Sequence, residues 1–257
     1  MRMLRVALAV LGLTAYPLHA QDTTWPREER APVPFAVGER AEYQVKFGFL
    51  SVGSASMDVV GIDTVRGQET WNTIFQLRGG IPGYRVNYRF QSWMHTRSLA
   101  SLRHWQIVAE GRRDAERKFE IFPGEHFIHN EFEPQPTVPL PLDDGSFFQF
   151  VRTLPLDVGA EYSFNRYFRP DRNPVVIQVL RRERVRVPAG TFDAVVLRPI
   201  IKSRGVFSED GQAEVWLTDD DRRIMVQMKT RLSFGSITLQ LRNYRSASVD
   251  SSANASP

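Results

Sequence analysis

Apolar and polar residues alternate with a period of two along much of this chain of 257 residues, and this pattern limits the folds available to it. In residues 41–47, 71–77 and 84–91 nearly every second side chain is apolar, and those between are mostly polar. Because a strand places successive side chains on opposite faces, such runs suit an antiparallel sheet with one face on a core. The sequence therefore predicts a mainly β protein with a curved antiparallel sheet, either barrel-like or a half-barrel.

From Val185 to Tyr244 the chain repeats strand and turn with almost no helix-forming stretch. Pro188 suits the second position of a type I turn, and Gly190 can take the left-handed conformation after it, which predicts a bulged hairpin. Asp219–Asp221 predicts another turn. Further strands are predicted over residues 102–110, 115–122, 126–132, 161–168, 175–187, 192–201, 213–217, 223–230 and 234–244.

One segment near the middle of the chain departs from the alternation. Apolar residues recur at helical spacing from Phe147 to Leu154, and residues 143–146 offer side chains that cap a helix N-terminus. We predict one short helix here, ending before Pro155, with its apolar stripe packed on the sheet. Asp143 and Asp144 are interpreted as helix caps rather than as paired catalytic carboxylates.

The first twenty residues have the three parts of a secretory signal. Arg2 and Arg5 precede an apolar run over residues 6–15, and Ala20 is the predicted last residue removed. The apolar run is too short to span a bilayer comfortably, which disfavours the alternative of an uncleaved membrane anchor. We therefore expect signal peptide 1–20 to export the protein to the periplasm or cell envelope, where it is soluble.

Residues 21–34 are polar and contain several prolines, which predicts an extended linker, and residues 246–257 predict a disordered tail. Residues 35–245 between them are expected to form a single β domain. The chain has no cysteine, which excludes disulfides and thiolate catalysis. A formal net charge of +4 is too small to suggest nucleic-acid binding, and we expect no cofactor.

Several short motifs follow one another in a recognisable order. They are residues 48–57 in a glycine-marked hairpin, Asp143–Arg152 at the helix, Pro188–Phe192 at a turn, and Val215–Asp220 followed by Gly235. In this order and spacing the chain resembles an exported bacterial family, domain of unknown function 3108. The resemblance implies a curved antiparallel or barrel-like fold in the cell envelope. It implies no activity, because the family has no established catalytic residues.

Arg182, Arg184 and Arg186 fall on one side of a predicted strand and form a row of positive charge. This row is a candidate contact for an anionic head group or a polysaccharide. The interpretation that we favour is a charged strand face that discourages aggregation.

His129, Glu131 and Glu133 share a face of another predicted strand, and His and carboxylate side chains are zinc ligands. A solvated polar face explains this metal candidate better. Asp219–Asp221 offers oxygen ligands for calcium, but a soluble hairpin tip accounts for three consecutive acids more simply. We identify no catalytic residue, because no nucleophile elbow or phosphate-binding glycine loop is present.

We therefore expect a non-enzymatic envelope protein that binds or carries a lipid or another apolar ligand. Residues 175–177 and 194–197 are apolar at consecutive positions, so that one strand face packs the core while the other lines a groove. One alternative is a cell-surface interaction or assembly module that contacts its partner through the arginine row. The others are a hydrolase with an unrecognised site and an outer-membrane barrel, which charged outward positions disfavour.

Overall fold

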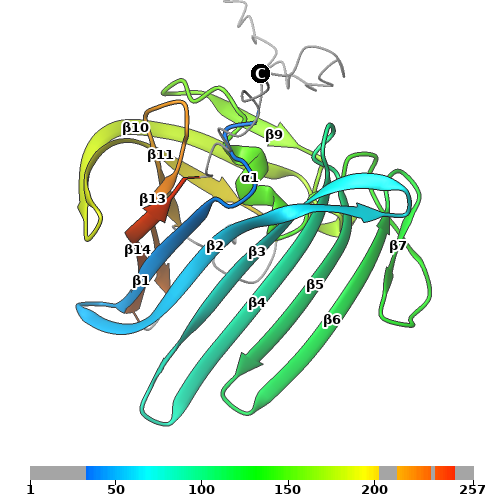
Figure 1. Ribbon diagram of the computed structural model, residues 1–257, viewed down its shortest axis with the longest axis horizontal. Helices are drawn as coiled ribbons and strands as arrows, with labels where there is room; N and C mark the ends of the chain where they lie inside the picture. The colour runs from blue at the N-terminus through cyan, green and yellow to red at the C-terminus, as the bar shows by residue number, and fades with distance from the viewer. Residues whose placement is uncertain (1–32, 203–212, 233–234, 247–257) are drawn as a thin grey trace, which may run out of the picture.

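The computed structural model describes residues 33–202, 213–232 and 235–246, and these form one antiparallel sheet of 14 strands around a short helix (Figure 1). The first strand, β1 (Arg40–Phe47), pairs with the last, β14 (Gly235–Arg245), in the middle of the sheet. From this seam the sheet continues on either side as an up-and-down meander.

Each meander follows the order of the chain, so that sequence neighbours are also neighbours in the sheet. On one side of the seam lie β2 (Leu50–Val65), β3 (Gln68–Ile81), β4 (Tyr84–His95), β5 (Ser101–Glu110), β6 (Arg113–Phe122), β7 (His126–His129) and β8 (Gln135–Pro136). On the other lie β13 (Met225–Leu232), β12 (Glu214–Thr218), β11 (Gly190–Ile200), β10 (Val175–Val187) and β9 (Glu161–Phe164). Helix α1 (Ser146–Val151) lies in the connection between the two meanders, from β8 to β9, and the 3-10 turn η1 (Pro170–Arg172) lies between β9 and β10.

The edge strands β8 and β9 do not pair with each other, so the sheet is curved but open. This confirms the prediction of a mainly β protein with a curved antiparallel sheet, barrel-like or half-barrel, and one short helix. The N- and C-terminal strands sit at the seam rather than at an edge, where unpaired backbone groups would invite pairing with another chain.

The hairpin predicted at Pro188 is confirmed. Strands β10 and β11 pair as far as Val187 and Gly190, and Gly190 has a φ of +140°, which L side chains rarely adopt. The expected bulge lies elsewhere, because the register shifts between Val179 and Arg181. A bulge increases local twist, and in Figure 1 this long hairpin curves over one end of the molecule.

Two predicted strands are shorter than expected. Strand β7 ends at His129 because Asn130 adopts a positive φ of +54°, which does not continue an extended strand. Strand β9 ends at Phe164, after which the chain leaves β10 and Tyr167 forms a parallel bridge with Leu142 instead.

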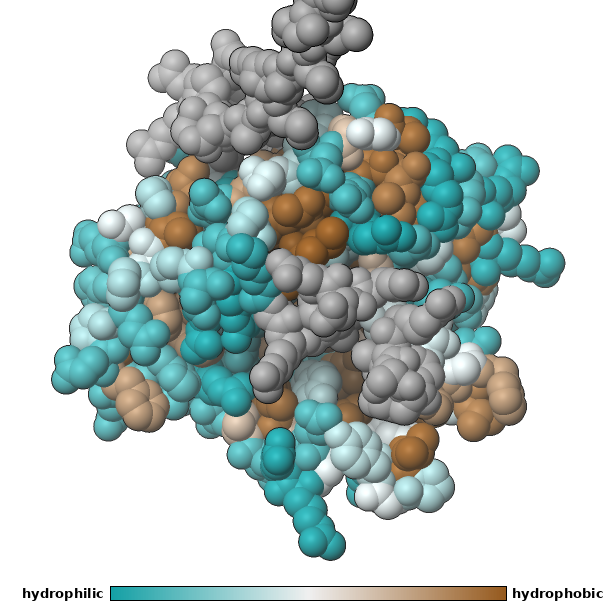
Figure 2. Space-filling model, turned by 180° about the vertical axis from the view of Figure 1, so that it is seen from behind, coloured by the Kyte–Doolittle hydropathy of each residue, from teal (hydrophilic) through white to brown (hydrophobic). Residues whose placement is uncertain are grey.

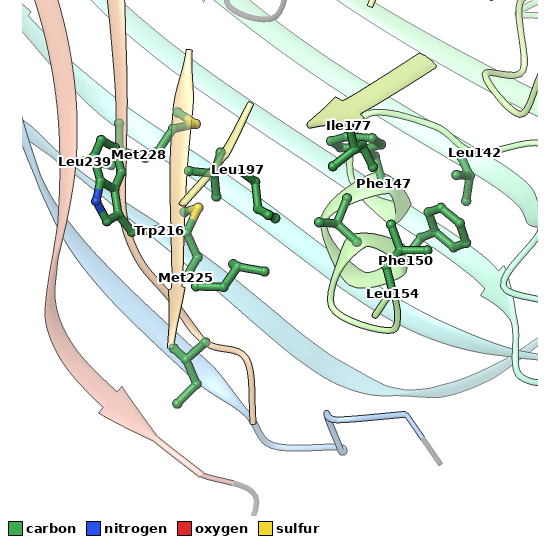
Figure 3. Packing of buried hydrophobic residues seen from close by; sticks show 14 of the residues in the cluster. Leu142, Phe147, Phe150, Leu154, Ile177, Leu197, Trp216, Met225, Met228 and Leu239 are labelled. Carbon is green, nitrogen blue, oxygen red and sulfur yellow. The ribbon is translucent and has the colours of Figure 1, made fainter. Parts of the chain in front are cut away.

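Helix α1 provides the interior of the curved sheet with apolar side chains. Phe147, Phe150 and Leu154 are buried in the main core cluster, and Figure 3 shows them beside Ile177 of β10. The helix ends at Val151 rather than at Leu154, because the following N–H groups bond three residues back in tighter turns. The predicted apolar stripe is therefore correct, but its last residue lies beyond the helix.

The structure corrects the predicted location of a groove. Ala194, Val195, Val196 and Leu197 are each at most 1 % exposed, so both faces of this part of β11 lie inside the core. Val175 and Ile177 are buried in the same cluster. These segments fill the core, and any open apolar face must be sought on other strands.

The predicted signal peptide 1–20, most of the predicted linker 21–34 and the predicted tail after residue 246 lie outside the described residues. Pro34, at the end of that linker, is described, and its carbonyl accepts a hydrogen bond from Arg152 at 2.7 Å. Across the parts of the chain with described placement, no helix is long and apolar enough to cross a membrane.

Candidate functional site

The inner face of the sheet is open where it extends beyond α1. Strand register places one set of apolar side chains from β3 to β6 on this face, where most are only half-buried. We call this surface the open face. Its residues are Phe75, Leu77, Val86, Tyr88, Phe90, Val108 and Ala115, and Phe148 of α1 lies at its boundary.

Aromatic rings run along the open face. Phe75 lies at its boundary with α1, with ring centroids 6.5 Å from Phe148 and 6.0 Å from Phe90. The ring of Tyr88 stacks on Phe90 at 6.2 Å, further from the helix. Brown side chains also appear in Figure 2 between the middle of the molecule and its lower edge. The open face is therefore an apolar surface that remains accessible in the folded protein.

Beneath α1, in contrast, little space remains. A cavity of about 30 Å³ lies between the helix and the sheet, lined by Tyr43, Met57, Phe147, Leu217 and other mostly apolar residues. That volume suits about one water molecule. Because small-molecule pockets usually measure about 300–1,000 Å³, this cavity is too small for a lipid chain.

Two polar clusters fasten α1 in place, and one of them is a buried ion pair. Arg152, at the C-terminal end of α1, donates from Nη1 to Glu39 Oε1 at 2.6 Å and from Nη2 to Glu39 Oε2 at 3.1 Å. Arg152 also donates to the carbonyl of Arg222 at 2.8 Å, and Glu39 accepts from the Tyr244 hydroxyl at 3.1 Å. This ion pair ties the helix to the N-terminal segment and to β14.

The two aspartates before α1 have different partners. Asp143 Oδ1 accepts the backbone N–H of Gly145 at 2.8 Å and of Ser146 at 2.9 Å, so it satisfies the first N–H of the helix, although Gly145 rather than Asp143 occupies the N-cap position. Asp144 does not cap the helix. Its Oδ1 accepts the Tyr167 hydroxyl at 2.8 Å, and its Oδ2 accepts the Gln106 amide at 2.6 Å. Interpreting Asp144 as a cap was therefore wrong, because it bonds to β5 and to the segment before η1.

His104 of β5 occupies the centre of the second cluster, where the start of α1 meets the sheet. Its side chain is fully buried. Its Nδ1 lies 3.1 Å from the Gln91 carbonyl oxygen, 3.3 Å from Ser92 Oγ and 3.5 Å from Asp143 Oδ1. Ser92 Oγ itself donates to Asp143 Oδ1 at 2.5 Å. Strands β4 and β5 therefore hold the helix through one shared carboxylate.

The other ring nitrogen of His104, Nε2, lies 2.9 Å from the Gln106 side-chain nitrogen and 3.7 Å from Asp144 Oδ2. Burial opposes the charged form of the ring, but the carboxylates of Asp143 and Asp144 outweigh this cost and raise the pKa of His104. Burial also opposes charge on Asp144, but hydrogen bonds from His104 and Tyr167 lower its pKa. His104 and Asp144 thus each favour the charged form of the other.

Ser92, His104 and Asp143 are the residue types of a hydrolase triad, but their geometry does not suit one. The Ser92 hydroxyl donates to Asp143 rather than to the imidazole. Because His104 Nδ1 faces the Gln91 carbonyl, it carries a proton and cannot act as a base toward Ser92. All three side chains are 0 % exposed. The cluster therefore holds α1 on the sheet, and it offers no path for a substrate.

The predicted arginine row lies on the exposed side of β10. Arg182 pairs with Asp219 at 2.9 Å and Arg184 pairs with Asp193 at 2.9 Å. Within the described residues, no carboxylate lies within ion-pairing distance of Arg186. Two of the three positive charges are therefore neutralised, so the arginine row exerts little electrostatic attraction on an anion.

The metal candidate is not assembled in the structure. Over the residues that the structure describes, no three His, Asp or Glu side chains gather closely enough to hold a metal ion, so His129, Glu131 and Glu133 do not form a ligand set. Burial and the positive charges of Arg169 and Arg117 lower the pKa of His129. The predicted turn at Asp219–Asp221 is present, and Asp220 Oδ1 accepts the backbone N–H of Arg222 at 3.1 Å.

Sequence reasoning missed the His104 cluster, although one signal was present. Ser92 continues the inward alternation of Tyr88 and Phe90, and His104 begins the inward alternation of the next strand. Polar residues at positions that alternation assigns to a core must find hydrogen-bond partners there. The signal identifies Ser92 and His104 individually, but only the strand register places them opposite each other.

An open, curved antiparallel sheet around one short helix defines a barrel-like class of β protein. The model of the family described as a protein of unknown function (DUF3108) matches residues 42–242, and the chain therefore belongs to that family, as the resemblance predicted. No curated protein matches the chain in sequence.

Three solved structures to which the chain is similar come from bacteria. A crystal structure of a beta-barrel-like protein of domain of unknown function DUF1849 from Brucella abortus has a TM-score of 0.51 at 8 % identity, covering 83 % of this chain and 99 % of that chain. A protein inferred to be a lipoprotein, from Parabacteroides distasonis, has a TM-score of 0.39 at 10 % identity, covering 84 % and 100 %. A protein inferred to be exported, from Bacteroides fragilis, has a TM-score of 0.32 at 10 % identity, covering 83 % and 98 %. Only the first of these supports the fold.

Proposed function

We propose that this protein is an exported, non-enzymatic protein of the cell envelope that holds a lipid or another apolar ligand on its open face. The observation that carries the proposal is the row of half-buried aromatic and aliphatic side chains beyond α1, from Phe75 to Tyr88. Export rests on the signal-like residues 1–20.

The energetic basis is the apolar surface that folding leaves in contact with water. Removing such surface from water contributes about 25 cal/mol per Å². A hydrocarbon chain lying along Phe75, Phe90 and Tyr88 covers these rings and is itself removed from water. Because the cavity beneath α1 measures about 30 Å³, the ligand lies on the open face rather than inside the core.

Native mass spectrometry tests the proposal on protein produced with export and purified gently from the envelope. We expect a bound species of lipid mass that organic extraction removes. The Tyr88→Asp variant, which places a charge on the open face, is expected to lose it. The matched control is Asn87→Asp, one residue earlier on β4 and facing the opposite side of the sheet. Ligand-free wild-type protein, or equal binding by Tyr88→Asp, contradicts the proposal.

A further inference from the structure

Three hairpins of the sheet end at one common edge. Strand pairs β1–β2, β3–β4 and β5–β6 turn at residues 48–49, 82–83 and 111–112, and successive antiparallel hairpins place these turns at the same ends of the strands. In Figure 1 they form the lower and left edge of the sheet. The open face extends to this edge, since Val86 and Val108 lie close to the hairpin turns.

Large apolar side chains project into water from two of these tips. Phe49 is 87 % exposed, more than any other large hydrophobic side chain of the described residues. Leu50 beside it and Ile81 on the neighbouring hairpin are each at least 50 % exposed, and Tyr84 is 44 % exposed, with its hydroxyl donating to Glu110 of the third hairpin. In Figure 2, which shows the molecule from behind, this edge lies at the lower right, and separate brown side chains stand there among teal and white ones. Hairpin turns are ordinarily built from Gly, Pro, Asn, Asp and Ser, so these apolar side chains need another explanation.

The same two tips are basic. Residues 46–53 and 78–85 contain Lys46, Arg78 and Arg85 and no acidic residue. Among residues of described placement, none of these three cations has a carboxylate within ion-pairing distance. The third tip, residues 110–114, has two arginines and two acidic residues. Positive charge therefore accompanies the exposed apolar side chains.

A turn at the opposite end of the same strands differs. Residues 63–69, between β2 and β3, contain Asp63, Arg66 and Glu69, and Arg66 forms an ion pair with Glu120. The Arg66 cation at this turn is therefore paired, whereas the cations at the two tips accompany exposed aromatic and aliphatic side chains without a carboxylate partner among the described residues. Such a combination is typical of segments that enter the interface of an anionic bilayer.

We propose that the hairpin tips around Phe49 and Ile81 dock this protein on an anionic lipid bilayer. Phe49, Leu50, Ile81 and Tyr84 enter the head-group region, and the nearby cations bind lipid phosphates. A bilayer suits this edge better than a protein partner, because the apolar side chains stand on separate tips rather than in one continuous patch of interface size. Docking does not depend on a bound ligand, but it brings the end of the open face to the membrane.

Vesicle flotation tests the docking with the protein purified from the envelope. We expect wild-type protein to bind vesicles containing phosphatidylglycerol, and to bind purely phosphatidylcholine vesicles much less. The double variant Phe49→Ser, Ile81→Ser is expected to weaken binding by about tenfold or more. Arg85→Ser is expected to weaken it by about fivefold, the effect of one basic residue near an anionic surface. High salt is expected to weaken wild-type binding.

Phe132→Ser provides the matched control, because Phe132 is also exposed, at 63 %, but follows β7 on another part of the molecule. This variant is expected to bind vesicles as wild type does, and all variants are expected to melt at the wild-type temperature. Equal binding by the double variant, or no preference for anionic vesicles, overturns the proposal. A double variant that changes only the oligomeric state identifies the tips as a protein interface and overturns it too. Native mass spectrometry of the double variant distinguishes docking from ligand binding. A double variant that retains the ligand but no longer binds vesicles has lost docking alone.

Discussion

Two halves of the inner face of the sheet use the same strand pattern and differ only in what covers them. Beneath α1, Tyr43 is buried and its hydroxyl donates to the Met225 carbonyl at 3.0 Å. Beyond α1, Tyr88 and Phe90 remain half-buried and stack on each other. Alternation therefore selects which side of a strand is apolar, and the placement of one short helix decides how much of that side meets water.

The polar groups at the ends of α1 explain why the covered half is fixed. Arg152 and Glu39 hold one end, and His104 with Asp143 and Asp144 holds the other. Buried charges are costly unless they are paired, so these contacts confine the helix to one position on the sheet. Among the described residues of the open half, no buried ion pair corresponds to these contacts.

Removing the arginine of the buried ion pair is expected to have the largest effect on the stability of the covered half. Arg152→Ala leaves Glu39 buried without its partner, so we expect the free energy of unfolding to fall by about 3–5 kcal/mol. Chemical denaturation measures the loss. Arg184→Ala is the control, because it removes an exposed ion pair with Asp193 and should leave the midpoint of unfolding unchanged. An Arg152→Ala variant as stable as the control contradicts a fastening role.

The same truncation of leucine to alanine should lower the free energy of unfolding by different amounts in the two halves. Leu154→Ala removes a buried side chain of the core just after α1, and we expect a loss of about 2–5 kcal/mol in the free energy of unfolding. Leu77→Ala on the open face should cost about 1 kcal/mol or less, because its side chain is already partly in water. Denaturation curves with unchanged slopes compare the two directly. Similar losses would show that the open face is as tightly packed as the covered half.

The His104 cluster should make stability depend on pH. Because the folded-state pKa of His104 is raised from 6.5, its contribution is complete below pH 6.5 and is lost as the pH rises through the folded value. At pH 5.5 we expect His104→Gln to be less stable than wild type by about 1.5–3 kcal/mol, the value of hydrogen bonds to charged groups. The difference should shrink as the pH rises, in thermal melts of both proteins.

The charge of Asp144 sets the lower end of the pH range in which the cluster stabilises the folded protein. Its pKa is lowered in the folded protein, so its contribution is present above the unfolded value of 3.8 and is lost as the pH falls through the folded value. The cluster should therefore stabilise the protein most at mildly acidic pH. A difference between wild type and His104→Gln that does not change with pH would exclude a charged imidazole.

The smallest effect is expected on the outer side of the sheet. Replacing Arg182, Arg184 and Arg186 together by Ser should change neither vesicle binding nor the set of proteins recovered in a pull-down. Asp219 and Asp193 already neutralise two of these charges. Loss of a specific partner from the triple variant would instead support the alternative of an interaction or assembly module that contacts its partner through this arginine row.

The sequence allowed much of the fold to be predicted, because strands and turns are specified locally. Alternation over residues 84–91 located β4 and its inner face, and Pro188 with Gly190 located a hairpin. The candidate site was less accessible to sequence reasoning. Residues 194–197 were expected to line a groove because they are apolar, but apolarity alone does not distinguish the two sides of a core from an open surface.

By itself the sequence determined the β class, the inward side of the strands, the turns and the presence of one helix, since each follows from the nearest few residues. Only the tertiary structure decided that β1 pairs with β14, that Ser92 lies opposite His104, and that α1 covers one half of the inner face. These features join residues far apart in the chain, and their positions follow from register and packing rather than from local preference.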